Sequence, residues 1–467
     1  MTASFDLIVL GAGSGGYACA LRAAQLGQRV ALVEKDKVGG TCLHRGCVPA
    51  KALLHAAEVA DAARHAADVG VIASIEGVDA ARLRDYSASV VKKLHTGLAG
   101  LVASRGIRVV EGTGQLVRDE SGLAVVVGDN RLQARHVVVA TGSRPRTLGL
   151  PIDHEQIVTS DDALWLDRLP RTAIVLGGGV IGVEFASAWT SLGVEVTIVE
   201  ALDRLMPGEI PAISQTLTRA FRRRGITART GTAIAEARVT DGEVRVRLDS
   251  GETLAADLLL VAVGREPASE GIGLAEAGVS LDEGGWVRVD DHLATAAPGV
   301  YAVGDLVRGP QLAHRGFGHG IHVAERIAQL SGRSDLRPRL TPDHLVPRVT
   351  YSSPEIASVG LSADQARAAE PGMQVDTVTY DLTGSAKAQI LRTQGFVQVV
   401  AEHGGPVLGI HMIGDRVSDL VGEAQLTVSW GAHADEVAEL LHAHPTLDEA
   451  LGEAMLALAG KPLHSHG

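Results

Sequence analysis

The chain has 467 residues, too many for one hydrophobic core, so its length predicts three or four domains. A formal net charge of −12 argues against nucleic acid and anionic membranes as binding partners, so an anionic ligand has to be held by local backbone donors. Three cysteines are too few for the disulfide framework of a secreted protein. The sequence shows neither a signal-peptide pattern nor an apolar segment of membrane-spanning length, which predicts a cytoplasmic protein with no membrane span.

The first feature along the chain is a series of strand, glycine turn, helix and strand, and this series occurs twice. Residues 5–10 and 29–33 are the strands of the first copy, and the second copy begins at residues 173–176. Each copy ends at an acidic residue, Glu34 or Glu200, which lies 23 positions after the first glycine of its turn. Because the same pattern occurs twice with the same spacing, it predicts two dinucleotide-binding units. The alternative is that the glycines serve only close packing of helix against strand. The turn glycines are Gly11, Gly13 and Gly16 in the first copy and Gly177, Gly179 and Gly182 in the second.

The two acidic residues predict which nucleotides bind. Glu34 and Glu200 are each expected to accept hydrogen bonds from an adenosine ribose, and the charge of Glu200 would repel a 2′-phosphate, which favours NAD over NADP. Two dinucleotides in one chain imply an electron relay between them. We assign FAD to the first unit, because a flavin exchanges electrons with both a nicotinamide and a thiol.

Short apolar runs that end in glycine predict further buried parallel strands. Residues 136–140 lead to Thr141 and Gly142, residues 258–263 lead to Gly264, and residues 299–303 lead to Gly304 and Asp305. Asp305 is a candidate to hold the ribitol chain of a flavin, and a helix N-cap is its equally simple alternative.

The predicted fold class is therefore α/β, with two doubly wound dinucleotide-binding domains and a C-terminal mixed α/β domain. The expected boundaries are 1–148 for the FAD domain, with a helical insert at about 51–105, then 149–270 for the NAD domain, 271–341 for a segment completing the FAD site, and 342–467 for the last domain.

Cys42 and Cys47 lie in a Gly/Pro-rich stretch directly after the first unit. Four residues separate them, and a disulfide closing so small a ring tends to be reducible and not structural. A zinc site lacks further ligands nearby, a structural disulfide does not suit a reducing compartment, and two inert core cysteines do not suit such a loop. We interpret the pair as redox-active and expect no metal. Cys19, among alanines on the first helix, is expected to pack in the core.

The run from Gly40 to Lys51 resembles the GTCLxxGCxPxK signature of the class I pyridine nucleotide–disulfide oxidoreductases. Ala140-Thr141-Gly142, the stretch from Gly177 to Glu184, Gly304-Asp305 and a C-terminal His-Pro pair match the family in order, over nearly the whole chain. Within the family the resemblance is strongest to the members that oxidise dihydrolipoamide, for three reasons. Glu200 favours NAD, the C-terminal tail lacks cysteine, and residues 442–449 are similar to the catalytic motif of those members.

The resemblance implies the remaining roles. His444 is expected to be the base of thiol exchange, Glu449 the carboxylate that orients it, and His442 a bystander. In the family the His-Pro pair comes from the partner subunit with a cis peptide bond, which implies a homodimer with shared active sites and a C-terminal dimerisation domain. Lys51 and Glu184 are expected to form an ion pair beside the flavin, with an ordinary helix salt bridge as the alternative. Thr41, Thr141, Gly142 and Gly264 complete the expected cofactor contacts.

The implied activity is the oxidation of protein-bound dihydrolipoamide, with electrons passing through Cys42 and Cys47 and FAD to NAD. The implied partners are the lipoyl domains of 2-oxoacid dehydrogenase complexes or of a glycine cleavage system. Two alternatives are a reductase of another disulfide, such as mycothiol disulfide, and a non-catalytic flavoprotein that serves as a docking subunit. The chain departs from the family pattern at three positions: His44 stands where many relatives carry Asn, Ala50 where Ser or Thr is common, and His319 where an acid is frequent. The departure at His319 bears on the charge near the flavin.

Overall fold

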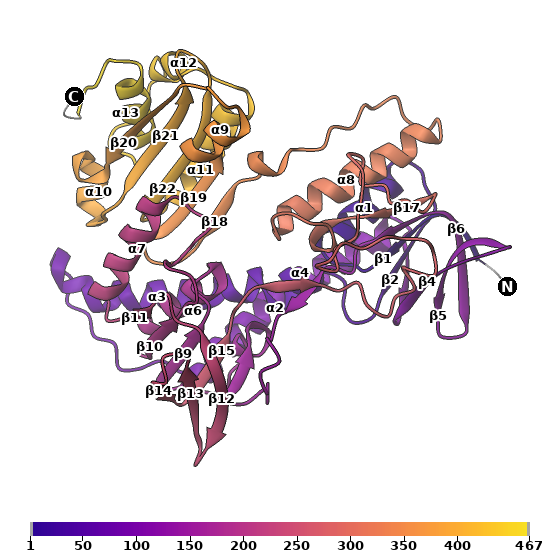
Figure 1. Ribbon diagram of the computed structural model, residues 1–467, viewed down its shortest axis with the longest axis horizontal. Coiled ribbons are helices and arrows are strands. Elements are labelled where there is room, and N and C mark those ends of the chain that lie inside the picture. The colour runs from indigo at the N-terminus through magenta and orange to yellow at the C-terminus, as the bar shows by residue number, and fades with distance from the viewer. Residues whose placement is uncertain (1–2, 465–467) are drawn as a thin grey trace.

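The structure is a computed structural model and describes residues 3–464. Its first sheet has seven strands in the order β3-β2-β1-β6-β5-β4, with β17 beside β6 (Figure 1). The strands β3, β2, β1, β6 and β17 are parallel neighbours, and β4 and β5 extend the sheet as an antiparallel hairpin. The bounds are β1 (Ala3–Leu10), β2 (Val30–Glu34), β3 (Arg108–Glu111), β4 (Gly114–Asp119), β5 (Gly122–Val127), β6 (Asn130–Val139) and β17 (Val300–Ala302).

The second sheet is fully parallel, in the order β11-β10-β9-β15-β8. An antiparallel three-stranded sheet, β12-β13-β14, and a two-stranded ribbon, β16-β7, accompany it. The bounds are β7 (Ser143–Pro145), β8 (Ile157–Thr159), β9 (Thr172–Leu176), β10 (Glu195–Val199), β11 (Thr227–Arg229), β12 (Ile234–Thr240), β13 (Glu243–Leu248), β14 (Thr253–Ala256), β15 (Leu258–Val261) and β16 (Arg265–Pro267).

The helices of these two domains cover the sheets and connect them. Helix α1 packs on the first sheet and α8 packs on α1, whereas α6 packs on the second sheet. Helices α3 and α4 run between the sheets, below the C-terminal domain in Figure 1. The bounds are α1 (Ser14–Gln25), α2 (Gly40–Arg45), α3 (Cys47–His65), α4 (Ala80–Ser104), α5 (Ser160–Ala163), α6 (Val180–Ser191), α7 (Pro211–Arg223) and α8 (Ala313–Leu330), with short 3-10 helices η1 (Ala66–Val69) and η2 (Gly304–Leu306).

The C-terminal domain is an antiparallel sheet, β18-β19-β22-β21-β20, with helices packed on it. The bounds are β18 (Arg348–Thr350), β19 (Glu355–Gly360), β20 (Val375–Asp381), β21 (Phe396–Glu402), β22 (Val407–Gly414), α9 (Ala363–Ala369), α10 (Ala386–Leu391), α11 (Val417–Ser429), α12 (Ala434–Ala438) and α13 (Glu449–Leu458), with η3 (Asp343–Leu345) and η4 (Leu382–Gly384). The predicted α/β class with two doubly wound sheets and a mixed C-terminal unit is confirmed.

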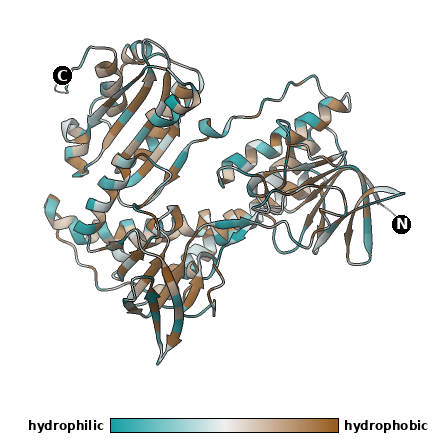
Figure 2. Ribbon diagram, in the orientation of Figure 1, coloured by the Kyte–Doolittle hydropathy of each residue, from teal (hydrophilic) through white to brown (hydrophobic). Residues whose placement is uncertain are grey.

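Apolar cores pack against each of the three large sheets, and Figure 2 shows apolar residues gathered along the strands. The core of the second sheet extends beyond its own domain, because it includes Leu53 and Leu54 of α3 as well as Phe396 and Ile413 of the C-terminal sheet. Helix α3 is therefore fixed between two domains. Among residues 3–464, no helix combines the length and apolar character needed to cross a bilayer.

Candidate active site

The first glycine turn is tightly packed at both ends and open in the middle. A Cβ on Gly11 would lie 2.4 Å from the Ala140 carbonyl oxygen, and one on Gly16 would lie 1.9 Å from the Gly11 carbonyl oxygen. A Cβ on Gly13 would have no neighbour closer than the Gly40 Cα at 4.0 Å. Helix α1 begins after Gly13 without a side-chain cap, so its N–H groups and its dipole are available to an anion.

The second glycine turn repeats this arrangement. A Cβ on Gly177 would lie 2.3 Å from the Ala262 carbonyl oxygen, and one on Gly182 would lie 1.9 Å from the Gly177 carbonyl oxygen. Gly179 faces open space, and it precedes α6, which also lacks a side-chain cap. Helix–strand packing explains the outer two glycines of each turn, whereas the open middle glycine leaves room for a phosphate to approach the backbone.

The two acidic residues at the strand ends hold the glycine turns in place. Glu34 accepts a hydrogen bond from the Ala12 N–H at 2.7 Å. Glu200 accepts from the N–H groups of Gly178 at 2.6 Å and Leu202 at 2.8 Å. A carboxylate has about four lone-pair positions, so both residues retain acceptor capacity for a ribose hydroxyl.

A cavity of about 1170 Å³ extends from the first glycine turn to the first residues of α6. This volume is slightly above the usual range of about 300–1,000 Å³ for small-molecule sites, which suits a dinucleotide. The predicted site residues that line it are Gly11, Gly13, Glu34, Thr41, Cys42, Cys47, Lys51, Thr141, Gly142, Glu184 and Asp305. The predicted site residues outside its lining are Gly16, Gly177, Gly179, Gly182, Glu200, Gly264, His444 and Glu449.

Both cysteines lie on helices, so the loop expected from their Gly/Pro-rich surroundings is wrong. Cys42 is the third residue of α2, and Cys47 is the first residue of α3. Pro49 does not prevent the helix, because it is the third residue of α3, where a missing N–H leaves no hydrogen bond unmade. Cys47 therefore stands at the positive end of a 19-residue helix dipole.

The two sulfurs have different acidities. Both cysteines are free thiols; Cys42 is half-buried and Cys47 is exposed to the cavity. A hydrogen bond from Cys42 and the Lys51 ammonium together lower the pKa of Cys47 to about 7, against the effect of burial. The same hydrogen bond, with burial, raises the pKa of Cys42. Near neutral pH the thiolate therefore resides on Cys47. Cys19 is fully buried in the core, as predicted.

Lys51 and Glu184 join α3 to α6 inside the cavity. The Lys51 Nζ donates to both Glu184 carboxylate oxygens, at 3.0 and 2.8 Å, and lies 4.6 Å from the centre of the Tyr351 ring. The Tyr351 N–H also donates to Glu184, at 2.9 Å. Since Glu184 is 7% exposed, these donors compensate for the burial of its charge. The pair links two domains and is more than a salt bridge within one helix.

Asp305 lies in η2 and lines the cavity. The N-cap of η2 is Val303, so the alternative role of Asp305 as a helix N-cap is wrong. The Asp305 carboxylate accepts from the Ser143 hydroxyl at 2.7 Å, and the Arg265 Nε donates to the same hydroxyl at 2.8 Å. Sequence reasoning missed Ser143 and Arg265; their only signal is that each directly follows a glycine at a predicted strand end.

The remaining strand-end residues also expose backbone. The Thr141 hydroxyl donates to the Ala268 carbonyl at 2.8 Å. Gly142 and Gly264 have positive φ angles of 72° and 97°, and a Cβ on either would meet no atom within 4 Å. Their backbone can therefore be approached closely by a ligand.

His444 and Glu449 form a pair in the C-terminal domain, away from the cysteines of the same chain. The His444 Nδ1 donates to the Glu449 carboxylate at 2.8 Å, which leaves Nε2 as the acceptor of a neutral imidazole. Although burial alone would raise the pKa of Glu449, hydrogen bonds from His444 and the Thr446 N–H lower it. The His444 side chain is 71% exposed, and the His444–Pro445 peptide bond is cis, as expected.

His442 makes a different contact. Its Nε2 lies 2.9 Å from a Glu423 carboxylate oxygen, and this hydrogen bond raises the pKa of His442. The ring packs against Gly452, where an added Cβ would lie 2.5 Å from Nδ1. The contacts of the half-buried His442 ring therefore serve the packing of the C-terminal domain.

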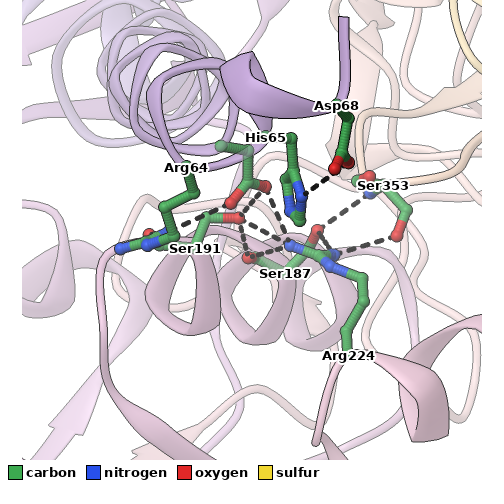
Figure 3. Close-up of polar contacts among 8 residues, drawn as sticks. Arg64, His65, Asp68, Ser187, Ser191, Arg224 and Ser353 are labelled. Carbon is green, nitrogen blue, oxygen red and sulfur yellow. Dashed lines mark hydrogen bonds and ion pairs between the residues drawn. The ribbon is translucent and has the colours of Figure 1, made fainter. Parts of the chain in front are cut away.

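A partly buried arginine, Arg224, joins three domains near the far end of α3 (Figure 3). The Arg224 guanidinium donates to the Ser187 hydroxyl at 2.7 Å, the Ser191 hydroxyl at 2.6 Å and the Ser353 carbonyl at 2.9 Å. It also lies 3.4 Å from the Asp61 carboxylate of α3. Helices α3 and α6 are therefore connected at one end by Lys51 and Glu184 and at the other by Arg224.

Comparison with protein families gives two matches that together cover most of the chain. Residues 5–320 match the family model described as pyridine nucleotide-disulphide oxidoreductase. Residues 346–455 match the model of the dimerisation domain of the same family.

The similar proteins agree with this assignment. The dihydrolipoyl dehydrogenase of Bacillus subtilis is 38% identical over 482 residues, covering 99% of this chain and 100% of that protein. Dihydrolipoyl dehydrogenase 3 of Pseudomonas aeruginosa is 38% identical over 480 residues, with full coverage of both. Among solved structures, LpdA of Mycobacterium tuberculosis has a TM-score of 0.88 at 26% identity, covering 98% of this chain and 100% of that one.

Proposed function

The chain belongs to the pyridine nucleotide-disulphide oxidoreductase family, and we propose that within it the chain acts as a dihydrolipoyl dehydrogenase. The observation that carries the proposal is the position of Cys47. It is the first residue of α3, lines the cavity that begins at the first glycine turn, and has the lower pKa of the cysteine pair. Full-length relatives at 36–38% identity bear the name of this activity.

The residues of the cavity fit FAD. Gly13 and the free N-terminus of α1 suit a pyrophosphate, Glu34 retains acceptor capacity for the ribose, and Asp305 can accept from the ribitol chain. When bound, FAD supplies a ring that takes two electrons from a thiol pair and passes them to a nicotinamide as hydride.

The second glycine turn fits NAD. Gly179 and the free N-terminus of α6 suit its pyrophosphate, and Glu200 opposes a 2′-phosphate. Arg204, the nearest cation along the chain, donates to the Pro207 and Glu209 carbonyls at 3.0 and 3.4 Å, so it is engaged by backbone.

Thiol exchange follows from the different acidities of the two cysteines. Starting from the Cys42–Cys47 disulfide, one thiol of dihydrolipoamide gives its proton to His444 and attacks the Cys42 sulfur, and Cys47 leaves as a thiolate. The second substrate thiol then loses its proton and closes the lipoyl ring, while Cys42 is expelled and takes up a proton. Two electrons have moved from the substrate to the cysteine pair.

His444 would come from a second copy of the chain. Its side chain is exposed and does not line the cysteine cavity of its own chain, and the same domain exposes Trp430 at 80% and Leu441 at 100%. A homodimer would bury this apolar surface and bring each imidazole to the partner's cysteines. The matched dimerisation domain supports this arrangement.

The partners we propose are lipoyl domains of 2-oxoacid dehydrogenase complexes or of a glycine cleavage system, in the cytoplasm. The support is the name shared by the relatives, since a dihydrolipoyl group in the cell is carried on such a domain.

Steady-state turnover by the purified protein tests the proposal. Dihydrolipoamide with NAD should be oxidised far faster than with NADP. If NADH or NADPH reduces another disulfide, such as mycothiol disulfide, faster than the enzyme oxidises dihydrolipoamide, the chain is a reductase of that disulfide instead. A flavin-containing protein that turns over none of these substrates would instead be a docking subunit.

A further inference from the structure

Helix α8 packs directly behind the wall of the cofactor cavity. A Cβ on Gly320 would lie 2.2 Å from the Gly15 carbonyl oxygen of α1, and one on Gly15 would lie 3.1 Å from a methyl carbon of Val303. At Gly15, helix α1 therefore contacts both α8 and the 303–305 turn, and a methyl group on Gly320 would clash with the α1 backbone. Because these segments are close-packed, a change in α8 near Gly320 must shift the cavity wall that α1 and the 303–305 turn form.

His319 is the polar residue of α8 at this contact. It is 3% exposed, and its Nδ1 accepts a hydrogen bond from the Gly304 N–H at 3.3 Å. Gly304 has a φ of 70°, a conformation that turns the chain into Asp305, and both residues line the cavity. Because Nδ1 is the acceptor, the imidazole proton of the neutral ring is on Nε2.

The surroundings of His319 keep it uncharged. Burial and the nearby Arg315 guanidinium lower the pKa of His319 to about 3, with a smaller contribution from His322. Arg315 and His322 face it from α8, and Asp343 of η3 forms an ion pair with Arg315 at 2.6 Å. At neutral pH the hydrogen-bond acceptor behind Gly304 is therefore an uncharged imidazole.

We propose that His319 is a positioning residue for FAD, one that holds the Gly304–Asp305 turn through a neutral acceptor and so adds no further negative charge near the flavin. This inference rests on the proposed binding of FAD in this cavity. A carboxylate at the same position would accept the same hydrogen bond, but it would disfavour the electron-rich reduced flavin and lower its reduction potential.

Three substitutions of the holoenzyme separate the two parts of the proposal. His319→Ala removes the acceptor and should release FAD about tenfold faster on dilution into mild denaturant, measured by flavin fluorescence. His319→Gln supplies a neutral acceptor and should restore slow release and leave the two-electron midpoint potential unchanged. His319→Glu should keep FAD bound but give a more negative midpoint potential than the wild type at the same pH, in measurements from pH 6 to 9.

His322 provides the matched control. It is equally buried at 3%, lies one turn along α8, and in residues 3–464 no hydrogen bond joins it to the 303–305 turn. His322→Gln should change neither FAD release nor midpoint potential. FAD release from His319→Ala at the wild-type rate would overturn the positioning role. A wild-type potential for His319→Glu over the whole pH range would overturn the charge role. If the wild-type protein binds no flavin, the proposed function fails instead.

Discussion

Lys51 donates to both carboxylate oxygens of Glu184, at 3.0 and 2.8 Å, and the same ammonium lowers the pKa of the Cys47 thiol. One cation thus holds α3 against α6 and stabilises the thiolate at the start of α3. The bond between the helices and the acidity of the redox centre are therefore coupled through a single side chain.

Replacing Lys51 by Gln should raise the pKa of Cys47 from about 7 toward the ordinary thiol value. Gln keeps a donor for Glu184 but removes the positive charge. The pH dependence of alkylation of the reduced enzyme by iodoacetamide measures this pKa. Lys92→Gln, at an exposed position of α4, is the control and should have no effect. An unchanged alkylation profile in Lys51→Gln would show that Lys51 does not act on the sulfur.

The two cysteines should behave differently when each is replaced by Ser. Both variants should bind FAD and lose dihydrolipoamide turnover. In Cys42→Ser a thiolate remains on Cys47, so the unreduced protein should show long-wavelength absorbance from the contact of thiolate and flavin, growing with pH. Cys47→Ser should lack this absorbance in every redox state. If the long-wavelength absorbance appears in Cys47→Ser and not in Cys42→Ser, the roles of the two sulfurs are the reverse of those proposed.

His444→Gln should reduce turnover by about 10²- to 10⁴-fold while FAD remains bound, because Gln cannot take the substrate proton. His442→Gln is the matched control, since its ring contacts Glu423 and Gly452, and turnover should remain near that of the wild type.

Co-expression of Cys47→Ser and His444→Gln chains tests whether the site is shared. In a mixed dimer one site combines an intact cysteine pair with the partner's intact imidazole, so random pairing should restore about a quarter of wild-type turnover. If each chain used its own His444, no site in any of these dimers would be complete and turnover would stay at background.

Arg224→Ala should lower the thermal unfolding midpoint by several °C. The change removes hydrogen bonds to Ser187, Ser191 and Ser353 and leaves Asp61 without this cation, a loss of about 2–3 kcal/mol. Arg222→Ala, on the exposed side of α7, should change the midpoint little. Equal midpoints for the two variants would mean that the junction in Figure 3 adds no stability.

The elements that could be predicted are those whose cause is local in sequence. Both glycine turns were found because a strand, a turn and a helix require these residues at fixed spacing, and the structure shows the same open middle glycine in each. The loop assigned to the cysteines was wrong because glycine and proline also suit the start of a helix, as Pro49 does in α3.

Contacts between distant segments could not be predicted. Ser143 and Asp305 are 162 residues apart, and Arg224 and Ser353 are 129 apart. No spacing in the chain encodes such pairs, because the packing of whole domains brings them together. The resemblance to a family identified Lys51 and Glu184, whereas Ser143, Arg265 and Arg224 became apparent only from the folded chain.

Acid should destabilise the protein partly through His319. Its pKa is about 3 when folded and 6.5 when unfolded, so between these values the unfolded chain binds one more proton. The contribution of His319 is therefore complete above pH 6.5 and is lost as pH falls toward 3, by about 2 kcal/mol at pH 5. His319→Gln does not titrate, so the difference in apparent unfolding free energy between it and the wild type should be constant above pH 6.5. Below that pH the variant should gain stability relative to the wild type in denaturant titrations. A difference that stays constant down to pH 5 would mean that the buried imidazole is protonated in the folded protein as easily as in the unfolded chain.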